Sequence, residues 1–332
     1  MNKVHIAKHG DCVLVAEAGG FETRFREAFE LSSSCELIEN PAAATIILIN
    51  QGWKSRNWHD IYELKACEYI RAYAEKLCVI SHDSFATVFL PGLYTSLTPN
   101  NHWSGWAIPM GYKQEYRSHT LDDNRHNAAG ERRWLFSFRG ADFTHPVRRK
   151  LARIYDEKSP SYSFVVVNKK FHTHNQDDHD KYIGEMLESH FVLAPRGISP
   201  SSYRMYEAMQ HSRCPVIISD DWRPITGIDW DSCSIRVKER DIGQIEALLR
   251  DRVNEAKKLG EQARRVWEEN FSDGARERRF LRDLLWLHSN CVFARDRQSL
   301  VQLWESRKFH KAHGWTPVQR GIRRLKSALR LA

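Results

Sequence analysis

Short apolar runs alternate with helical segments along the first third of the chain. Residues 44–50 (ATIILIN) predict a buried strand, residues 62–77 have apolar side chains at helical spacing, and residues 78–83 (CVISHD) predict a strand with a polar end. Two further strands and a helix are predicted at residues 4–7, 12–17 and 22–31. Such alternation favours an α/β fold with a mostly parallel sheet, in which ligand groups gather at the carboxyl ends of strands.

A second alternation follows an irregular stretch at residues 90–111 and a polar stretch at residues 119–133, which we interpret as the linker between domains. Its strands and one helix are predicted at residues 132–140, 147–157, 162–168, 191–197 and 214–220. A chain of 332 residues exceeds the usual size of a single domain. The expected division is a first domain at 1–130, a second domain at 131–270, carboxyl-terminal helices at 271–305 and a basic tail at 306–332.

Composition narrows the class of protein and its partners. The seven cysteines are odd in number and lack C-x-x-C spacing, which argues against a disulfide framework and a structural zinc site. No apolar run approaches the roughly 20 residues that span a bilayer, and no signal-peptide pattern is present at the start, so the expected location is cytoplasmic. The formal charge of +8 favours anionic partners. Nucleic acid is not expected, because no recognition helix, zinc finger or RNP-type strand accompanies the basic residues.

One segment combines the groups that an anionic ligand requires: FVLAPRGISPSSYRMYEAMQHSRCPVIISDDW. A helix that begins near Ser201 or Ser202 would direct its unpaired N–H groups and its positive dipole end into the preceding loop. Arg196 and Arg204 flank this loop, and guanidinium groups offer forked donors to diphosphate oxygens. Glu207 lies about one helical turn after Arg204, where its carboxylate could accept hydrogen bonds from the two hydroxyls of a ribose.

The same spacing allows a purely structural interpretation. Ser201 could be an N-cap, Arg204 and Glu207 an i, i+3 salt bridge, and Arg196 a residue of a surface turn. Spacing alone leaves both interpretations open.

The motifs FVLAPRG, SSYRMYEAM and CPVIISDDW, in this order, resemble the carboxyl-terminal half of exostosin-type glycosyltransferases. The resemblance covers about residues 133–270, takes in the SFRG turn at 137–140, and extends weakly to the amino-terminal half. It implies the GT-B architecture, in which two Rossmann-like domains face each other across a cleft and carboxyl-terminal helices return to the first domain. It also implies transfer of a sugar from a nucleotide donor with inversion at the anomeric carbon.

By this resemblance, domain 131–270 binds the nucleotide sugar and domain 1–130 binds the acceptor. Glu207 would hold the ribose, and Arg139 of the SFRG turn would complete a clamp on the diphosphate, although it could equally be a turn arginine. The diphosphate itself would be held by Arg196, Gly197, Ser201, Ser202 and Arg204. Many relatives have Gly-Cys or Ala-Cys where this chain has Ser212 and Arg213, so close helix packing or nucleotide contact at that point is in doubt.

An inverting transfer needs a base that deprotonates the acceptor hydroxyl, and the acceptor side is expected to supply it. Asp83, beside His82, follows the strand at 78–81, and Asp11 follows the first strand. These three residues are the candidates for the base. His82 with Asp83, and His9 with Asp11, are also common compositions for ordinary turns.

No metal or other cofactor is expected, since side chains and helix ends neutralise the diphosphate in GT-B enzymes. Two acidic motifs nevertheless have metal-like spacing: the His/Asp run at residues 172–180, which we interpret as a solvated loop, and D-W-D at 229–231. The chain contains neither GxxxxGK[ST] nor GxGxxG, so P-loop and dinucleotide sites are not supported.

The protein is expected to be an inverting glycosyltransferase that transfers a sugar to a glycan or lipid-linked glycan of a surface polysaccharide or lipopolysaccharide. The expected donor is a UDP-sugar. The basic tail at 306–332 carries interspersed apolar residues and could bind an anionic membrane at its inner face, or could be a solvated helix on the domain surface. The alternative function is a non-catalytic protein of the same fold that binds acidic glycans or lipid head groups.

Overall fold

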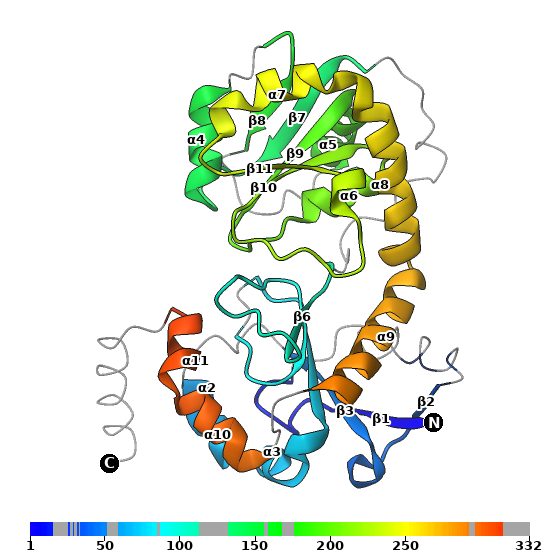
Figure 1. The fold of residues 1–332 in the computed structure, drawn as a ribbon, viewed down its shortest axis with the longest axis vertical. Coiled ribbons are helices and arrows are strands. Elements are labelled where there is room, and N and C mark those ends of the chain that lie inside the picture. Colours follow the sequence, from blue (N-terminus) through cyan, green and yellow to red (C-terminus); the bar gives the residue numbers. More distant parts are fainter. Residues whose placement is uncertain are drawn as a thin grey trace. The chain divides into compact units, whose positions relative to one another are not determined.

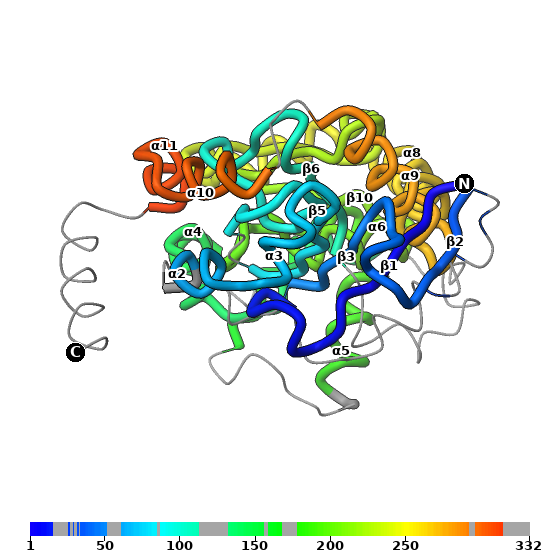
Figure 2. Tube along the Cα trace, turned by 90° about the horizontal axis from the view of Figure 1, so that it is seen from below, coloured from blue at the N-terminus to red at the C-terminus, as the bar shows by residue number. Residues whose placement is uncertain are grey.

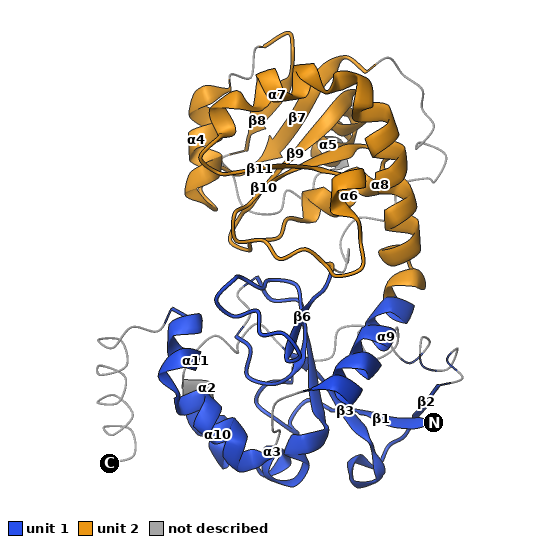
Figure 3. Cartoon of the chain, in the orientation of Figure 1, with its two compact units in different colours: residues 1–110, 277–332 blue, residues 111–276 orange. Residues whose placement is uncertain are grey.

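The computed structural model describes residues 1–15, 34–51, 59–84, 87–112, 132–155, 159–167, 176–291 and 296–314, with the single residues 26, 29 and 32. The chain divides into two compact units (Figure 3): residues 1–110 with 277–332 form unit 1, and residues 111–276 form unit 2. The first boundary lies before the predicted linker because Tyr112 packs in unit 2, where its ring contacts those of Tyr203 and Tyr206. Residues 119–131 of that linker lie outside the described residues.

Unit 2 contains a five-stranded sheet whose strands are all parallel, in the order β11-β10-β9-β7-β8 (Figure 1). The strands are β7 (Trp134–Gly140), β8 (Ser163–Val166), β9 (Ser189–Pro195), β10 (Cys214–Ile218) and β11 (Ile235–Val237). The helices are α4 (Pro146–Ile154), α5 (Gln176–Leu187), α6 (Tyr203–Gln210), α7 (Ile245–Asp251) and α8 (Ala256–Asn270). Short 3-10 helices, η5 (Trp230–Ser232), η6 (Ile242–Gln244) and η7 (Val253–Glu255), join the later elements.

Helices cover both faces of this sheet, as the alternation of side chains along β9 demonstrates. Phe191 and Leu193 point into a core shared with α4 and α7, whereas Val192 and Ala194 pack toward α5, α6 and α8. A strand that is buried on both faces reads as a continuous apolar run, which explains why the sequence predicts these central strands well.

Unit 1 contains a six-stranded parallel sheet in the order β2-β1-β3-β4-β5-β6, and Figure 2 shows β2, β1 and β3 side by side at one edge. The strands are β1 (Asn2–Ile6), β2 (Cys35–Leu37), β3 (Ile46–Gln51), β4 (Leu77–Ser81), β5 (Gly92–Tyr94) and β6 (Ala107–Pro109). The helical elements before unit 2 are η1 (Pro41–Ala43), α2 (His59–Ala66), α3 (Glu68–Tyr73) and η2 (Ala74–Lys76).

The carboxyl-terminal helices complete the core of unit 1 on both faces of its sheet. Helix α9 (Ala275–Asn290) adds Phe280 and Leu284 to the core over one face. Helices α10 (Arg297–Glu305) and α11 (Arg307–Ala312) add Trp304 and Phe309 to the core over the other face. Of the basic tail, residues 306–314 are described and include α11, which packs on unit 1, while residues 315–332 lie outside the described residues.

Two local predictions in unit 1 differ from the structure. The segment at residues 12–17 does not form the predicted strand: it makes an isolated bridge from Val15 to Gln51, and its described apolar residues lie in a turn that packs into the core. Residues 16 and 17 lie outside the described residues. The stretch at residues 90–111, predicted to be irregular, contributes β5 and β6. Each strand has three residues, which are too few to show an apolar pattern in a stretch rich in Gly and Pro. Of the helix predicted at 22–31, only Arg26 and Phe29 are described.

The predicted α/β class is confirmed: both units are Rossmann-like, with parallel sheets, as the GT-B class requires. In each sheet the first strand lies between the second and the third, which is the doubly wound order 2-1-3-4-5. Such sheets bind ligands beyond the carboxyl ends of the strands at the point where the strand order reverses. These points lie between β1 and β3 in unit 1 and between β7 and β9 in unit 2.

Within the part of the chain that the structure describes, no helix is long and apolar enough to cross a membrane. All seven cysteines are free thiols, and five of them are buried.

Close helix packing, which Ser212 and Arg213 placed in doubt, is achieved through a glycine on another helix. Ser212 has φ of 55°, a backbone conformation that favours glycine. Its carbonyl oxygen lies 2.3 Å from the position that a Cβ at Gly260 of α8 would occupy. Only glycine at position 260 therefore lets α8 approach the chain between α6 and β10.

We expect Gly260→Ala to lower the free energy of unfolding by about 1–3 kcal/mol, because the added methyl group overlaps backbone atoms that cannot move aside. The matched control is Gly184→Ala in α5, where nothing lies within 4 Å of the added Cβ. That substitution should raise stability by up to about 1 kcal/mol through helix propensity. Urea unfolding of both variants measures the difference, and effects of equal sign would contradict the packing described for α8.

Candidate functional site

The carboxyl ends of β7 and β9 bring together two of the predicted turns at the point where the strand order of unit 2 reverses. Strand β7 ends at Arg139 and Gly140, and β9 ends at Pro195, directly before Arg196. The two strands are hydrogen-bonded neighbours in the sheet. Helices α4 and α6 begin after these strands, so two helix amino termini follow the same edge.

Arg148, on the first turns of α4, ties the two strand ends together. Its Nε donates to the carbonyl oxygen of Arg196 at 2.9 Å and its Nη2 to that of Pro195 at 3.0 Å. Its Nη1 donates to the carbonyl oxygen of Ala141 at 3.3 Å. A Cβ at Gly197 would lie 3.2 Å from Nη2, so the absence of a side chain at Gly197 makes room for this guanidinium group.

The partners of Arg148 are carbonyl groups rather than carboxylates, which leaves its positive charge uncompensated. Burial, followed by the positive charge of Arg204, lowers the pKa of Arg148 to about 9. The group therefore remains a cation at neutral pH and raises the electrostatic potential at the ends of β7 and β9.

Arg204, on the first turn of α6, lies at the same edge against two aromatic rings. Its guanidinium carbon is 4.7 Å from the ring centroid of Phe138 and 5.7 Å from that of Tyr182. Its Nη2 donates to the carbonyl oxygen of Arg139 at 2.5 Å. A Cβ at Gly140 would lie 2.7 Å from Nη2, so the glycine of the SFRG turn is what allows Arg204 this position.

The amino terminus of α6 retains capacity for an anion. Its N-cap is Ser202, in an extended conformation and without a side-chain hydrogen bond to the helix, and no acidic residue lies in the first turn. Ser201 is 4% exposed, and its Oγ has no hydrogen-bond partner among the described residues. An anionic acceptor stabilises both a buried hydroxyl of this kind and the positive end of a helix that has no side-chain cap.

The other two predicted arginines are paired with carboxylates. Arg139 makes a bidentate ion pair with Glu185 of α5, with Nε to oxygen at 2.9 Å and Nη2 to oxygen at 2.5 Å. Arg196 pairs with Asp221 and lies 3.8 Å from Glu239. A diphosphate that bound Arg139 or Arg196 would compete with these carboxylates, whereas Arg148 and Arg204 have no ion-pair partner among the described residues.

Glu207 lies one turn after Arg204, as predicted, but its partner is on another helix. Its Oε2 accepts a hydrogen bond of 2.5 Å from the hydroxyl of Tyr182 in α5. The structural interpretation predicted Ser201 as the N-cap and a salt bridge between Arg204 and Glu207. In the structure Ser202 is the N-cap, and Arg204 and Glu207 each contact Tyr182.

His145 is the N-cap of α4, and its Nδ1 accepts a hydrogen bond from the N–H of Val147. Burial, and then the positive charges of Arg196 and Arg148, lower the pKa of His145 to about 4. Because Nδ1 is the acceptor, the neutral ring carries its proton on Nε2 and can act as a donor.

The sequence did not identify Arg148, His145 or Tyr182 as site residues. Arg148 and His145 lie just after the SFRG strand, so the rule that ligands bind where the strand order reverses could have drawn attention to this helix start. Tyr182 lies in α5, between the SFRG segment at 137–140 and the segment that begins at Phe191, and no spacing rule connects it with Glu207.

The candidates for the base lie at the corresponding edge of the sheet in unit 1. Asp83 is 2% exposed and follows β4, and the ring of His82 lies 6.2 Å from that of Phe280. Asp11 follows β1, and its Oδ2 accepts a hydrogen bond of 2.7 Å from the N–H of Lys8. In the sheet, β3 separates these two strands, which places them about 10 Å apart.

Gln51, at the end of β3 between the two candidate aspartates, is a polar residue that the sequence did not single out. It is 4% exposed, and its Nε2 donates to the carbonyl oxygen of Thr87 at 3.2 Å. Its Oε1 has no partner among the described residues. A buried amide oxygen of this kind is suited to accept a hydrogen bond from a ligand hydroxyl.

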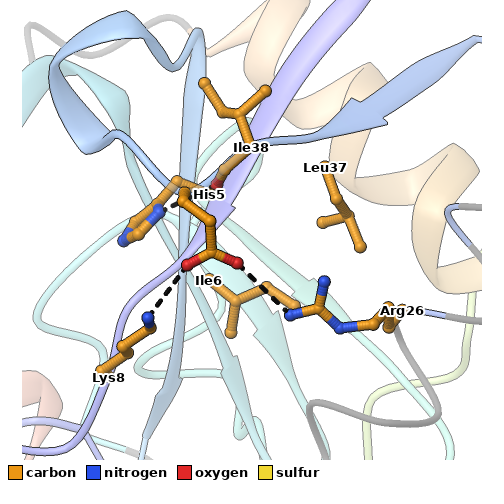
Figure 4. A pocket seen from close by; sticks show the side chains of 7 residues that line it. His5, Ile6, Lys8, Arg26, Leu37 and Ile38 are labelled. Atoms are coloured by element: carbon orange, nitrogen blue, oxygen red, sulfur yellow. Dashed lines mark hydrogen bonds and ion pairs between the residues drawn. The ribbon is translucent and has the colours of Figure 1, made fainter.

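A pocket in unit 1 has none of the predicted site residues in its lining (Figure 4). It is lined by His5, Ile6, Lys8, Arg26, Leu37, Ile38 and Glu39. The Glu39 carboxylate lies 2.9 Å from Nζ of Lys8 and 3.7 Å from Nη2 of Arg26. These three charged side chains are 41–69% exposed, so the ion pairs at the pocket are weak surface pairs.

The two acidic motifs have structural positions in unit 2. Residues 176–180 of the His/Asp run form the start of α5 rather than a loop, while residues 172–175 lie outside the described residues. Asp229 is the N-cap of η5, and its carbonyl oxygen accepts a hydrogen bond from Ser232. Among the described residues, no three His, Cys, Asp or Glu side chains are grouped so that they could share a metal ion.

The lowered pKa of His145 predicts a specific loss of stability in acid. Between its pKa of about 4 in the folded chain and its ordinary value of 6.5, the unfolded state binds more protons, so stability falls as the pH falls through this range. The contribution is about 1 kcal/mol, reduced from the full shift because the ring is partly exposed. His145→Asn keeps a capping side chain.

Thermal unfolding from pH 7 to pH 4.5 should therefore show a shallower decline for His145→Asn than for the unmodified chain. His190 and His313, whose pKa values burial also lowers, titrate in both proteins and cancel in the comparison. Parallel curves would show that His145 does not carry the effect.

Comparisons with known proteins agree with the geometry of unit 2. A family model for the exostosin GT47 domain matches residues 81–251. The exostosin-1 homolog of Caenorhabditis elegans is 31% identical over 172 residues, which cover 47% of this chain and 44% of the relative. Exostosin-1 of Drosophila melanogaster is 27% identical over 186 residues, covering 50% and 24%. The chain thus matches less than half the length of these relatives.

Solved structures resemble the chain more distantly. TarM is 11% identical, with a TM-score of 0.42 over 73% of this chain and 54% of TarM. Anabaena HepE in complex with UDP is 8% identical, with a TM-score of 0.40 over 86% of this chain and 100% of HepE. The family match, in contrast, covers more than half of the chain and includes β7 to β11 with Arg139, Arg196 and Arg204. The chain belongs to the exostosin GT47 family of glycosyltransferases.

Proposed function

We propose that the carboxyl edge of the sheet in unit 2 binds the nucleoside diphosphate of a sugar donor, and that the enzyme transfers the sugar with inversion. One observation carries the proposal: Arg148 and Arg204 lie at this edge as cations that have no carboxylate partner among the described residues. A ligand with two adjacent phosphates supplies the missing negative charge.

The remaining groups at this edge suit the same ligand. The amino terminus of α6, which has no side-chain cap, and the Oγ of Ser201, which has no hydrogen-bond partner among the described residues, suit phosphate oxygens. Arg196 joins them when phosphate displaces Asp221, whose side chain is 48% exposed and easily rehydrated. Glu207 is then the acceptor for the ribose hydroxyls.

Transfer builds negative charge on the departing diphosphate, and the fixed cations of unit 2 stabilise that charge. Guanidinium groups remain protonated throughout, so they fulfil the role that a divalent cation has in other transferases. The proposed reaction is therefore independent of metal ions.

The base is proposed to come from unit 1, with Asp83 as the first candidate. Its buried position after β4 limits its contact with water. Asp11 is the second candidate, although its carboxylate is already committed to the N–H of Lys8. His82 is the third. The base takes the proton of the acceptor hydroxyl as that oxygen attacks the anomeric carbon from the side opposite the diphosphate.

The acceptor is proposed to be a glycan or a lipid-linked glycan of a surface polysaccharide or lipopolysaccharide, and the donor a UDP-sugar. The basic tail at 306–332 is proposed to hold the enzyme at an anionic membrane when the acceptor is lipid-linked. Nucleic acid is not a proposed partner.

Arg204→Ala should abolish the stabilisation of the protein by nucleoside diphosphate. For the unmodified chain, we expect at least one of UDP, GDP, ADP, CDP and dTDP to raise the melting temperature. The substitution should weaken binding at least tenfold, since hydrogen bonds to charged groups contribute about 1.5–3 kcal/mol. Thermal shift with this panel measures both effects and ranks the bases.

The matched control for this experiment is Arg264→Ala; Arg264 lies in α8, and its side chain contacts the carboxyl-terminal end of α6. Arg264 stacks on Trp267 at 4.9 Å and donates to the carbonyl oxygen of Gln210. Its loss removes a guanidinium group that is stacked on an aromatic ring, together with its ion pair to Glu268 at 2.6 Å, without touching the carboxyl edge of the sheet. If the control loses nucleotide binding as Arg204→Ala does, or if no nucleoside diphosphate shifts the melting temperature, the donor site is assigned wrongly.

Metal independence has its own test. With a donor identified by the panel, we expect transfer to proceed at the same rate within about twofold in the presence of EDTA, because arginines carry the charge of the leaving group. Restoration of a lost activity by Mg²⁺ or Mn²⁺ would refute this part of the proposal.

A further inference from the structure

Tyr182 connects the two residues to which the proposed function gives the phosphate and the ribose. It lies on α5, is 8% exposed, and its hydroxyl donates to Oε2 of Glu207 at 2.5 Å. Its ring centroid lies 5.7 Å from the guanidinium carbon of Arg204. One buried side chain of a neighbouring helix thus contacts both working residues of α6.

The hydroxyl of Tyr182 restricts the orientation of the Glu207 carboxylate. A glutamate near a helix start has several rotamers, and fixing one of them costs free energy each time a ligand binds. A hydrogen bond from a buried phenol selects one orientation in advance. A carboxylate offers about four lone-pair positions, so Tyr182 occupies one and leaves the others for a ligand.

We propose that Tyr182 is a positioning residue that orients Glu207 for the two hydroxyls of a ribose, and that the Tyr182–Glu207 pair makes the site selective for ribonucleotides. This inference rests on the proposed donor function. Two neighbouring hydroxyls match two carboxylate oxygens only when the carboxylate plane is fixed, because both hydrogen bonds need good geometry at once. A nucleotide without these hydroxyls gains nothing from the pair.

Tyr182→Phe removes the hydroxyl and keeps the ring that faces Arg204. The probes are the nucleoside diphosphate that gives the largest thermal shift in the panel, its 2′,3′-dideoxy analogue, and inorganic pyrophosphate. Calorimetric titration should show binding of the ribonucleotide weakened about three- to tenfold, the range that loss of one such hydrogen bond predicts. Binding of the dideoxy analogue and of pyrophosphate should change by less than about twofold.

Two variants control this experiment. Glu207→Gln should remove the preference for the ribonucleotide, since the amide offers one acceptor oxygen instead of two. Tyr155→Phe removes a buried tyrosine hydroxyl of the same unit, which bonds to the carbonyl oxygen of Ile242 at 2.9 Å. That variant should lose stability but retain the full preference for the ribonucleotide.

Three results would overturn the inference: an unchanged ratio of ribonucleotide to dideoxy affinity in Tyr182→Phe, tighter ribonucleotide binding in that variant, or a preference of the unmodified chain for dTDP. Tighter binding would mean that Tyr182 competes with the ribose for Glu207. Failure of the donor proposal is distinguishable, because then neither pyrophosphate nor any nucleoside diphosphate binds the unmodified chain.

Discussion

A single guanidinium group, that of Arg148, joins the ends of the two strands between which the order of the second sheet reverses. It donates hydrogen bonds to the carbonyl oxygens of Ala141, Pro195 and Arg196, which lie at the end of β9 and in the loops that lead to α4 and α6. The loops cannot separate without leaving buried donors and acceptors unpaired, at a cost of about 1–3 kcal/mol for each. Both helix amino termini are therefore fixed before any ligand arrives, which is the condition for preorganised stabilisation of charge.

Around this link, the charges of the site fall into two groups. Arg139 and Arg196 are paired with carboxylates, and their first effect is to fasten α5 and the loop after β10 to the sheet edge. Arg148 and Arg204 interact with carbonyl groups and aromatic rings, which orient a guanidinium group without cancelling its charge. Glycines at positions 140 and 197 make this arrangement possible, because a Cβ at either would approach one of the two cations.

Much of the fold follows from the sequence because β3, β4, β9 and β10 are buried on both faces and read as continuous apolar runs. The short strands β5 and β6 do not, since three residues give no period to recognise. In the candidate site, the placement of Ser201, Arg204 and Glu207 around the start of α6 was predictable because a helix start fixes their spacing. The partners of those residues were not. The contacts from Tyr182 to Glu207 and from Arg148 to Pro195 join residues on different elements, and only the packed structure brings them together. The same limit applies to Arg139, whose ion pair with Glu185 spans strand and helix.

The division of the chain also bears on how the protein is made. Unit 2 is one continuous segment, residues 111–276, whereas unit 1 needs residues 277–312 to supply Phe280, Trp304 and Phe309 to its core. Domains fold as units while the chain leaves the ribosome, at about 5–20 residues per second. Unit 2 can therefore fold several seconds before unit 1 is complete. During this interval the early strands of unit 1 expose the apolar surface that α9, α10 and α11 later cover, and such surface is prone to aggregation.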